Sequence, residues 1–468
     1  MHGKDIDMAR RVAEKVARAG GSTYFVGGFV RDQLMGRENK DVDIEVHGVS
    51  PETLEGILDS LGERTQMGAS FGILGLRHYD LDIAMPRQEK ATGRGHKDFQ
   101  VYVDPFIGPR NAALRRDFTI NALMQDVLTG EILDFFGGQR DLEKRLIRHV
   151  NDETFQEDPL RVLRGAQFAA RFDFQIAAET IALSQTMALD ALSHERIMGE
   201  LEKALLKAEK PSVFFWEMRK MKQLSFWFPE AERLIGVPQD ALHHPEGDVW
   251  NHTMLTLDEA AALRNEAHKP LWFMLSALCH DFGKPDTTEI KPDGRIHAYR
   301  HESAGVKIAH RFLSRITTET ELRRYVLNMV EMHMEPGKKI RDGSKRKSFM
   351  HMFDEALDPD DLLLLSRADH LARRDPENGE ARQLLLDQYR ETDEQLHALL
   401  EDYRALMAQP AVRGQDLIDA GIRPGPVFTE ALAYAHKLRL AGIDRDSALQ
   451  QTLGMLRKLE NTEDDHND

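Results

Sequence analysis

The chain has 468 residues, of which 41% are hydrophobic and 30% charged, and its formal net charge at pH 7 is −16. This length is too great for one ordinary core, so we expect several domains. No apolar run reaches the ~18 residues of a membrane span, and the charged N-terminus lacks the apolar core of a signal peptide. The negative net charge argues against a protein that coats nucleic acid nonspecifically. With Cys279 as the only cysteine, no internal disulfide can form, and we expect a cytoplasmic protein.

The first elements carry clear boundary signals. Residues 1–21 predict an amphipathic helix with Ala9, Val12 and Val16 on one side, ended by two glycines. The sequence Ser50-Pro51-Glu52 predicts a second helix, because a serine N-cap, a proline in the first turn and an acidic residue are typical of helix starts.

Between these helices, residues 25–46 predict a strand, a turn and a second strand. Asp41 and Asp43 lie two positions apart, so in extended backbone their side chains point to the same face. Two such carboxylates can hold a pair of hard divalent ions, which stabilises both oxygens of an in-line phosphoryl displacement. Gly28 lets the backbone approach a phosphate, and Arg31 adds a fork of donors. Taken alone, a D-x-D pair is more often a solvated turn or a cap.

The ordered set of motifs in residues 27–43 is far more specific than any of its parts. GG, RD, G and KDVD follow one another in a strand–turn–strand unit. This set resembles the signature of class II tRNA nucleotidyltransferases (CCA-adding enzymes) and bacterial poly(A) polymerases. Phe29 stands where that family usually has alanine, at a position expected to pack rather than to bind. The resemblance implies nucleotidyl transfer in which Asp41 and Asp43 hold Mg²⁺ and Gly28 and Arg31 contact the triphosphate.

A third carboxylate is expected in residues 71–85, which predict two strands. The second strand places Asp80 and Asp82 on one face. Phosphoryl transfer commonly needs such a group to complete the oxygen shell of a metal or to activate the attacking hydroxyl. Spacing alone makes Asp80 nearly as good a candidate, whereas the resemblance assigns the role to Asp82.

Residues 115–122, RRDFTINA, match the motif RRDxTxNA of the same family. The resemblance implies that Arg116 holds the triphosphate and that Asp117 and Asn121 order the ribose pocket. Without that context, the segment would be interpreted as a helix start capped by Asp117.

Residues 157–164, EDPLRVLR, match the EDxxR element of the family. Because Pro159 suits a first helical turn, we expect Asp158 and Arg161 to be neighbours on one helix face. A carboxylate that only accepts and a guanidinium that only donates can together read the edge of a base. The resemblance implies that this pair selects CTP or ATP, with Arg164 nearby. In isolation, the pair would be a simple intrahelical ion bridge.

A second constellation begins after residue 247. Six residues lie within or beside apolar helical patterns: His252, His280, Asp281, His301, His333 and Asp369. Imidazole and carboxylate together bind transition metals, and a metal-bound water ionises near neutral pH. The order of these residues, with HDFGK at its centre, resembles the HD phosphohydrolase superfamily. The resemblance implies a site for Ni²⁺, Mn²⁺, Co²⁺ or Zn²⁺, whereas the pattern leaves open whether His301 and His333 bind a metal or a phosphate.

The expected fold is a multidomain one: an α/β head with the nucleotidyltransferase fold, followed by all-α parts. We assign residues 1–150 to the head and residues 151–240 to a helical neck and body for base selection and RNA binding. Residues 241–375 form the HD domain, and residues 376–468 form a helical tail.

The function implied is template-independent addition of CCA to the 3′ end of tRNA from CTP and ATP, with phosphohydrolase activity for 3′-end repair. An enzyme that adds only CC or only A is a close alternative. A poly(A) polymerase is another, although those relatives lack an HD domain and have a basic extension where this chain has an acidic tail. From a different class, the chain could be an HD phosphohydrolase of small nucleotides with a noncatalytic head, or a noncatalytic RNA-binding protein. We expect no membrane partner and either a monomer or a homodimer.

Overall fold

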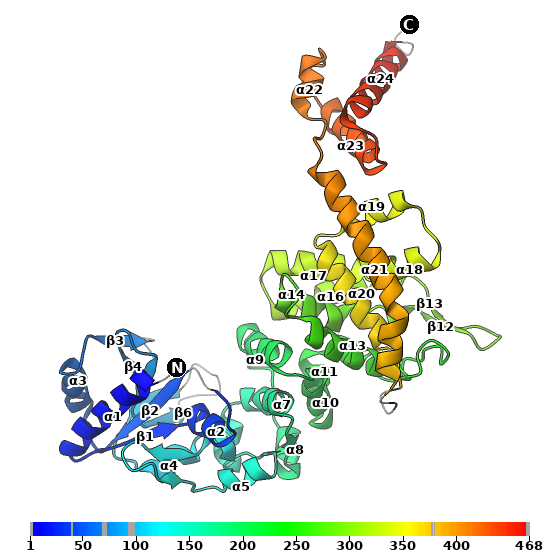
Figure 1. Ribbon diagram of the computed structural model, residues 1–468. Coiled ribbons are helices and arrows are strands. Elements are labelled where there is room, and N and C mark those ends of the chain that lie inside the picture. The colour runs from blue at the N-terminus through cyan, green and yellow to red at the C-terminus, as the bar shows by residue number, and fades with distance from the viewer. Residues whose placement is uncertain are drawn as a thin grey trace. The chain divides into compact units, whose positions relative to one another are not determined.

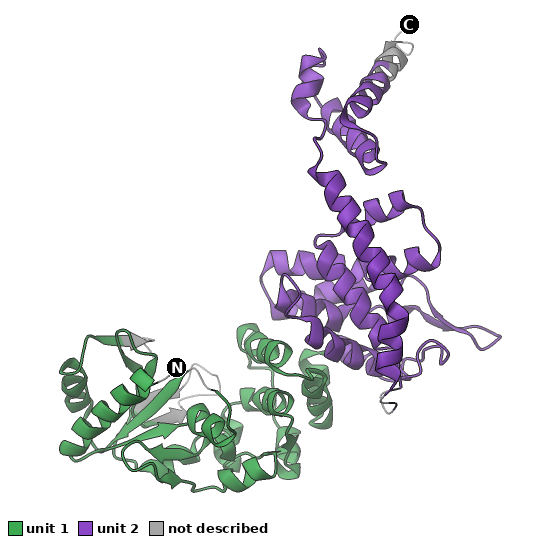
Figure 2. Ribbon diagram, viewed as in Figure 1, with its two compact units in different colours: residues 1–229 green, residues 230–468 purple. Residues whose placement is uncertain are grey.

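The structure is a computed structural model, which describes residues 3–38, 41–67, 73–91, 99–375, 378 and 380–464. Lys40 of the KDVD motif lies outside the described residues. The chain divides into two compact units, residues 1–229 and 230–468 (Figure 2). The expected head and most of the expected neck lie in the first unit, so their separation into two domains remains a prediction.

A mixed sheet of seven strands forms the centre of the first unit, in the order β3-β4-β5-β2-β1-β8-β9 (Figure 1). Its strands are β1 (Ser22–Val26), β2 (Val42–His47), β3 (Arg64–Met67), β4 (Ile73–Leu76), β5 (Leu81–Ala84), β8 (Met124–Asp126) and β9 (Ile132–Leu133). Within it, β2 and β5 run parallel, whereas every other neighbouring pair is antiparallel. The parallel pair sets Asp43 directly opposite Asp82.

The boundary signals in the sequence are confirmed at both early helices. In α1 (Gly3–Arg18), Ala9, Val12 and Val16 are buried, as the periodicity predicts. The helix α3 (Pro51–Asp59) begins where Ser50 Oγ accepts a hydrogen bond from the amide of Thr53 at 3.3 Å. The expected packing role of Phe29 is also confirmed, because its buried ring lies 4.7 Å from that of Phe25.

The rest of the first unit is mostly helical. Its further elements are α2 (Gly28–Leu34), β6 (Arg87–Ala91), β7 (Phe99–Val103), α4 (Pro109–Leu114), the 3-10 helix η1 (Thr119–Asn121), α5 (Gly138–Glu143), β10 (Leu146–Ile147), α6 (Asp152–Glu157), α7 (Leu160–Phe172), β11 (Gln175–Ile176), α8 (Ala178–Ser184), α9 (His194–Lys207), α10 (Ser212–Lys220), α11 (Leu224–Trp227) and, at the border with the second unit, α12 (Pro229–Glu232). Phe118 is fully buried and contacts the rings of Phe155 and Phe168. This aromatic cluster joins the segment before η1 to α7.

The described residues of the second unit form helices and one small hairpin. Its elements are α13 (Val249–Leu263), α14 (Pro270–Cys279), α15 (Lys284–Thr287), β12 (Thr288–Ile290), β13 (Ile296–Ala298), α16 (His301–Ile316), α17 (Thr320–Met332), α18 (Glu335–Arg341), α19 (Arg346–Glu355), α20 (Pro359–Leu371), α21 (Ala381–Ala408), α22 (Gly414–Asp419), α23 (Val427–Leu440) and α24 (Arg445–Asp464). Helices α13 and α14 pack against α20, and α14 also packs against α17. Among the described residues, no helix is both long and apolar enough to cross a membrane.

Candidate active sites

Three carboxylates predicted from the sequence meet at the parallel strand pair of the first unit. Asp43 and Asp82 are partners in the register of β2 and β5, and Asp41 directly precedes β2. Burial raises the pKa of Asp43 to about 6, with Asp82 and Asp41 adding to the shift and Arg116 opposing it. Burial and Asp41 likewise raise the pKa of Asp82. A divalent cation held by these oxygens would relieve the repulsion and lower both pKa values.

Arg116 reaches this cluster across the turn that precedes α2. Its Nη2 lies 3.4 Å from Oε2 of Glu45, a strand residue on the same face as Asp43. Gly27 has a φ of +63°, and a Cβ built there would lie only 2.8 Å from Arg116 Nη1. The first glycine of the motif thus provides both a left-handed backbone and room for the guanidinium. Arg116 thus lies beside the carboxylates, and its role in holding the triphosphate remains a prediction.

Arg31 lies deeper than the sequence suggests. Its side chain is buried, with Nη1 donating to Asn121 Oδ1 at 2.6 Å and Nη2 2.7 Å from Asp32 Oδ1. The guanidinium also lies 4.6 Å from the centre of the Phe172 ring. In this arrangement Arg31 ties α2 to η1, and direct contact with a phosphate would require it to exchange these partners. Its role in triphosphate binding therefore remains a prediction.

Asp117 joins the RRD motif to α7. Its Oδ2 accepts from Arg164 Nε at 2.8 Å, and its Oδ1 accepts from Asn121 Nδ2 at 3.0 Å. Burial raises the pKa of Asp117, but Arg164 and Asn121 outweigh this effect, so the pKa lies below its ordinary value. The carboxylate is thus held ionised and orients both a guanidinium and an amide. Asp117 therefore does more than cap a helix, and its role in ordering the ribose pocket remains a prediction.

Asp158 stands just before α7 rather than in its first turn, so the expectation that it shares a helix face with Arg161 is wrong. It is the C-cap of α6, in extended backbone, and α7 begins at Leu160. Its Oδ2 lies 2.7 Å from Nη2 of Arg196 on α9. No sequence pattern marks Arg196, because only the packing of α9 against α7 brings it to this position.

Arg161 is fixed by main-chain acceptors. Its guanidinium donates to the carbonyl of Thr154 and, at 2.8 Å, to the carbonyl of Arg115. These bonds join α7 to α6 and to the first residue of the RRD motif. An arginine held in this way presents its remaining donors in a fixed direction, which suits recognition of a planar partner such as a base edge.

The six His and Asp residues predicted in the second unit come together. They form two groups of buried side chains, each with its ligand atoms within 4.8 Å of one another: His252, His280 and Asp369, and Asp281, His301 and His333. Asp281 touches both groups, because its Oδ2 lies 3.2 Å from His280 Nε2 and its Oδ1 lies 3.3 Å from His301 Nε2. His301 and His333, which the sequence left open, are therefore immediate neighbours of the other four.

Three of the imidazoles are oriented in the same way. Nδ1 of His280, His301 and His333 lies 2.8, 2.9 and 2.7 Å from the carbonyl oxygen three residues earlier. A carbonyl only accepts, so Nδ1 carries the proton and Nε2 is left as a ligand atom. Within the described part of the chain, the buried Nε2 of His280 has no hydrogen-bond partner. Burial, together with His301 and His280, lowers the pKa of His333 to about 3. This is the neutral state that metal binding requires.

His252 is oriented by a carboxylate that no sequence motif predicts. Its Nδ1 lies 2.7 Å from Glu246 Oε1, which also lies 2.8 Å from Nδ1 of His244. The side chain of Glu246 is fully buried. In the sequence, residues 243–247 are typical of a domain boundary. The six-residue spacing between Glu246 and His252 crosses the start of a helix, so it gives no periodic signal. A carboxylate behind a histidine increases its basicity as a metal ligand.

The two sites differ in chemistry as well as in fold. The first unit has carboxylates on a parallel strand pair of a mixed sheet. The second unit has a buried site of histidines and aspartates between helices. Together they define a nucleotidyltransferase head linked to an HD-type metal domain. Family models agree, with a poly A polymerase head domain matched at residues 23–148 and an HD domain matched at residues 249–374.

Known relatives cover both units. The multifunctional CCA protein of Actinobacillus pleuropneumoniae is 40% identical over 317 residues, 66% of this chain and 74% of the relative. That of Haemophilus ducreyi is 37% identical over 362 residues, 75% of this chain and 85% of the relative. The chain belongs to the family of multifunctional CCA proteins. The Thermotoga maritima CCA-adding enzyme complexed with tRNA has the same fold, with a TM-score of 0.61 at 20% identity over 97% of this chain and 96% of that one.

Proposed function

We propose that this chain completes the CCA sequence at the 3′ end of tRNA from CTP and ATP without a nucleic-acid template. The observation that carries the proposal is the register that sets Asp43 opposite Asp82, with Asp41 and Arg116 beside them. Family membership supports it, since the relatives are multifunctional CCA proteins. The RNA 3′-hydroxyl would attack the α-phosphate, forming an ester bond to the growing end and releasing pyrophosphate.

The carboxylates of the head would hold Mg²⁺. Asp41 and Asp43 offer hard oxygen ligands, and Asp82 would complete the oxygen shell or take the proton of the attacking hydroxyl. Mg²⁺ bound there would neutralise charge that develops on the phosphoryl oxygens. Gly28, Arg31 and Arg116 would bind the triphosphate, and Arg31 would do so after exchanging its partners Asn121 and Asp32.

The test of this function is incubation with tRNA that lacks its 3′ CCA. CTP alone, ATP alone, both together, and UTP or GTP are supplied with Mg²⁺, and products are sized to one nucleotide. Addition of three residues only when CTP and ATP are both present supports the proposal. Growth by CC only, by A only or by a long A tract would identify one of the alternatives instead.

Base choice is assigned to Asp158 and Arg161, with Arg164 nearby. Arg161→Ala is expected to relax the preference for C and A over U and G by about tenfold, because it removes donors aimed at the base edge. The apparent KM for CTP should change less than the selectivity does. Competition among the four NTPs measures both quantities. Unchanged selectivity would reduce Arg161 to a bridge between the carbonyls of Thr154 and Arg115.

The second unit would be a metal-dependent phosphohydrolase that repairs 3′ ends. Its ligands are mostly imidazoles, which favour Ni²⁺, Mn²⁺, Co²⁺ or Zn²⁺ over Mg²⁺. The two buried groups, which Asp281 connects, offer ligands for two adjacent ions. Such an ion supplies an ionised water, and hydrolysis adds that water across one P–O bond of a 2′,3′-cyclic or terminal phosphate. The chain would act in the cytoplasm, as a monomer or a homodimer.

A further inference from the structure

A cavity opens beside the histidine cluster of the second unit. It has a volume of about 280 Å³ and lies between α18, α20 and α21. Two of the side chains that line it are His333 and Asp369. These belong to different ligand groups, so a molecule in the cavity would contact both groups at once. A cavity of this size accommodates about one nucleotide.

The lining of the cavity is cationic. Lys338 and Arg341 extend from α18, and Arg373 lies just past the end of α20. Of the described residues that line it, Asp369 is the only acidic one, and it is a ligand candidate. Lys338 Nζ lies 3.6 Å from its nearest carboxylate oxygen, and Arg341 Nε lies 3.8 Å from its own. These separations are too long for hydrogen bonds, so both cations can serve an anion in the cavity.

Arg373 connects the cations to the ligand groups. Its Nη2 lies 2.6 Å from Asp369 Oδ2. Its Nε is buried and, within the described part of the chain, has no hydrogen-bond partner. The guanidinium therefore positions a ligand carboxylate with one nitrogen while another remains available to a bound oxygen.

The same cavity also has an aromatic and apolar part. The rings of His370 and Tyr389 lie 4.6 Å apart, and Met334 and Ile340 complete this side. Inorganic phosphate would use only the cations, whereas a nucleotide would also place its ribose or base against these side chains.

We propose that this cavity is the substrate site of the HD domain and binds a ribose phosphate, with Lys338 and Arg341 holding its phosphate. Arg373 acts as a positioning residue between that anion and Asp369. The inference rests on the proposed phosphohydrolase function and adds to it the place where the substrate binds and the residues that hold it. A free nucleotide and the 3′ end of an RNA carry this same chemistry.

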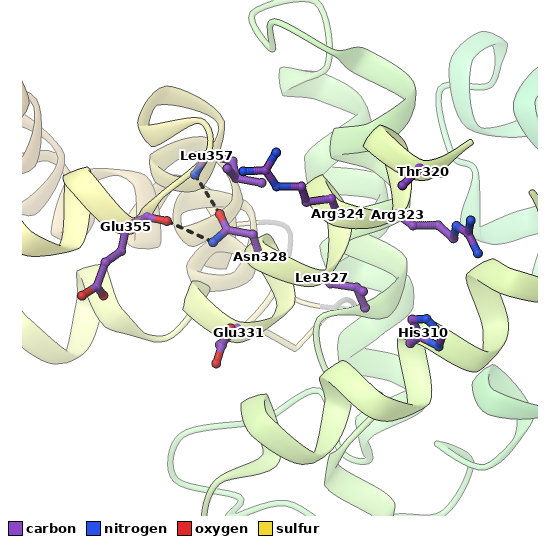
Figure 3. Close-up of a pocket in the computed structure, with 9 residues that line it drawn as sticks. All are labelled: His310, Thr320, Arg323, Arg324, Leu327, Asn328, Glu331, Glu355 and Leu357. Atoms are coloured by element: carbon purple, nitrogen blue, oxygen red, sulfur yellow. Dashed lines mark hydrogen bonds between the residues drawn. The ribbon is translucent and has the colours of Figure 1, made fainter. Parts of the chain in front are cut away.

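A second hollow of the same unit provides a matched control. Figure 3 shows it between α16, α17 and the segment after α19, with Arg323 and Arg324 among its lining residues. The described residues that line it include no member of the two ligand groups. The side chain of Arg324 is 64% exposed and that of Arg341 is 66% exposed. Arg324→Ala thus removes an equally exposed cation from a hollow that contains none of the metal-ligand candidates.

The experiment uses the full chain loaded with each transition metal in turn. We expect the double variant Lys338→Ala, Arg341→Ala to raise KM for 2′,3′-cyclic AMP about tenfold, with kcat within about threefold of wild type and metal content unchanged. Arg324→Ala should leave KM unchanged. A short RNA that ends in a 2′,3′-cyclic phosphate is the second substrate. An effect on both substrates identifies the nucleotide itself as the ligand, and an effect on the RNA alone identifies its 3′ end.

A binding measurement separates this inference from the proposed activity. Adenosine 3′-monophosphate is dialysed against wild type, the double variant and Arg324→Ala without CTP or ATP, because those nucleotides are ribose phosphates too and would compete for the cavity. Binding weakened about tenfold in the double variant supports the site even if no metal gives hydrolysis, which would overturn only the proposed activity. Equal binding and equal KM in wild type and double variant, or equal weakening by Arg324→Ala, would overturn the assignment of the cavity.

Discussion

Replacing Asp41 or Asp43 by alanine is expected to lower the rate of nucleotide addition by at least about a thousandfold while tRNA binding stays nearly unchanged. Either carboxylate would hold Mg²⁺, and losing a metal ligand removes stabilisation that is made mainly in the transition state. Single-turnover addition of CMP to tRNA measures the rate, and a filter-binding titration measures affinity for tRNA. Near-normal turnover in either variant would contradict the assignment.

Loss of activity in the Asp43 variant should not arise from unfolding. The pKa of Asp43 is raised to about 6, so the folded state binds its proton more tightly than the unfolded chain does. The ionised carboxylate therefore destabilises the metal-free fold near pH 7, and this penalty disappears as the pH falls below the unfolded pKa. Removing the group at pH 7 should leave thermal stability equal or slightly higher without metal, which a melting curve in EDTA checks.

Asp80→Ala provides the matched control for the head. Spacing in the sequence made Asp80 nearly as good a third carboxylate as Asp82. In the structure, Asp80 is exposed and precedes β5, whereas Asp82 lies within the strand opposite Asp43. Activity should therefore survive in Asp80→Ala and fall steeply in Asp82→Ala.

Asp80 and Asp82 differ in a property that local sequence patterns cannot predict. Local patterns predicted the strands, the caps and the D-x-D pair, because those depend on neighbouring residues. The choice between the two carboxylates depends on which strand pairs with β2 and in which register, across about 40 residues of chain. Likewise, the motif that names Arg31 does not reveal that its guanidinium is buried against Asn121.

In the second unit, the order of His and Asp residues predicted which side chains would gather but not what orients them. Glu246 lies behind His252 because the loop before α13 folds back, and no periodicity marks it. Arg373 follows Asp369 by four residues, a spacing visible in the sequence, yet such pairs are usually surface ion pairs. Only the structure shows that Nε of Arg373 is buried and that Arg373 lines the cavity.

The double variant His280→Ala, Asp281→Ala is expected to lose all transition-metal-dependent phosphohydrolase activity and to keep Mg²⁺-dependent CCA addition. Both residues are buried among the ligand groups, and Asp281 touches both groups, so their removal dismantles the metal site. The carboxylates of the head belong to the other compact unit and are hard oxygen ligands. Release of phosphate from p-nitrophenyl phosphate and opening of a 2′,3′-cyclic nucleotide are measured with each metal, beside CCA addition.

Folding of the second unit needs its own control, because Asp281 is paired with Lys284 at 2.7 Å. Loss of Asp281 leaves this nearly buried cation with the neutral Oε1 of Gln239 as a partner. Breaking such a pair costs about 3–5 kcal/mol. His280→Ala alone is milder, since it removes the Nδ1 bond to a carbonyl and the contact of Nε2 with Asp281 but leaves the pair of Asp281 and Lys284 intact. It should remove hydrolysis equally. His310→Ala, an exposed histidine of α16, should remove nothing. If the wild type hydrolyses neither substrate with any metal, the HD domain is a docking module. If His280→Ala loses CCA addition to the same extent as hydrolysis, the two sites are coupled.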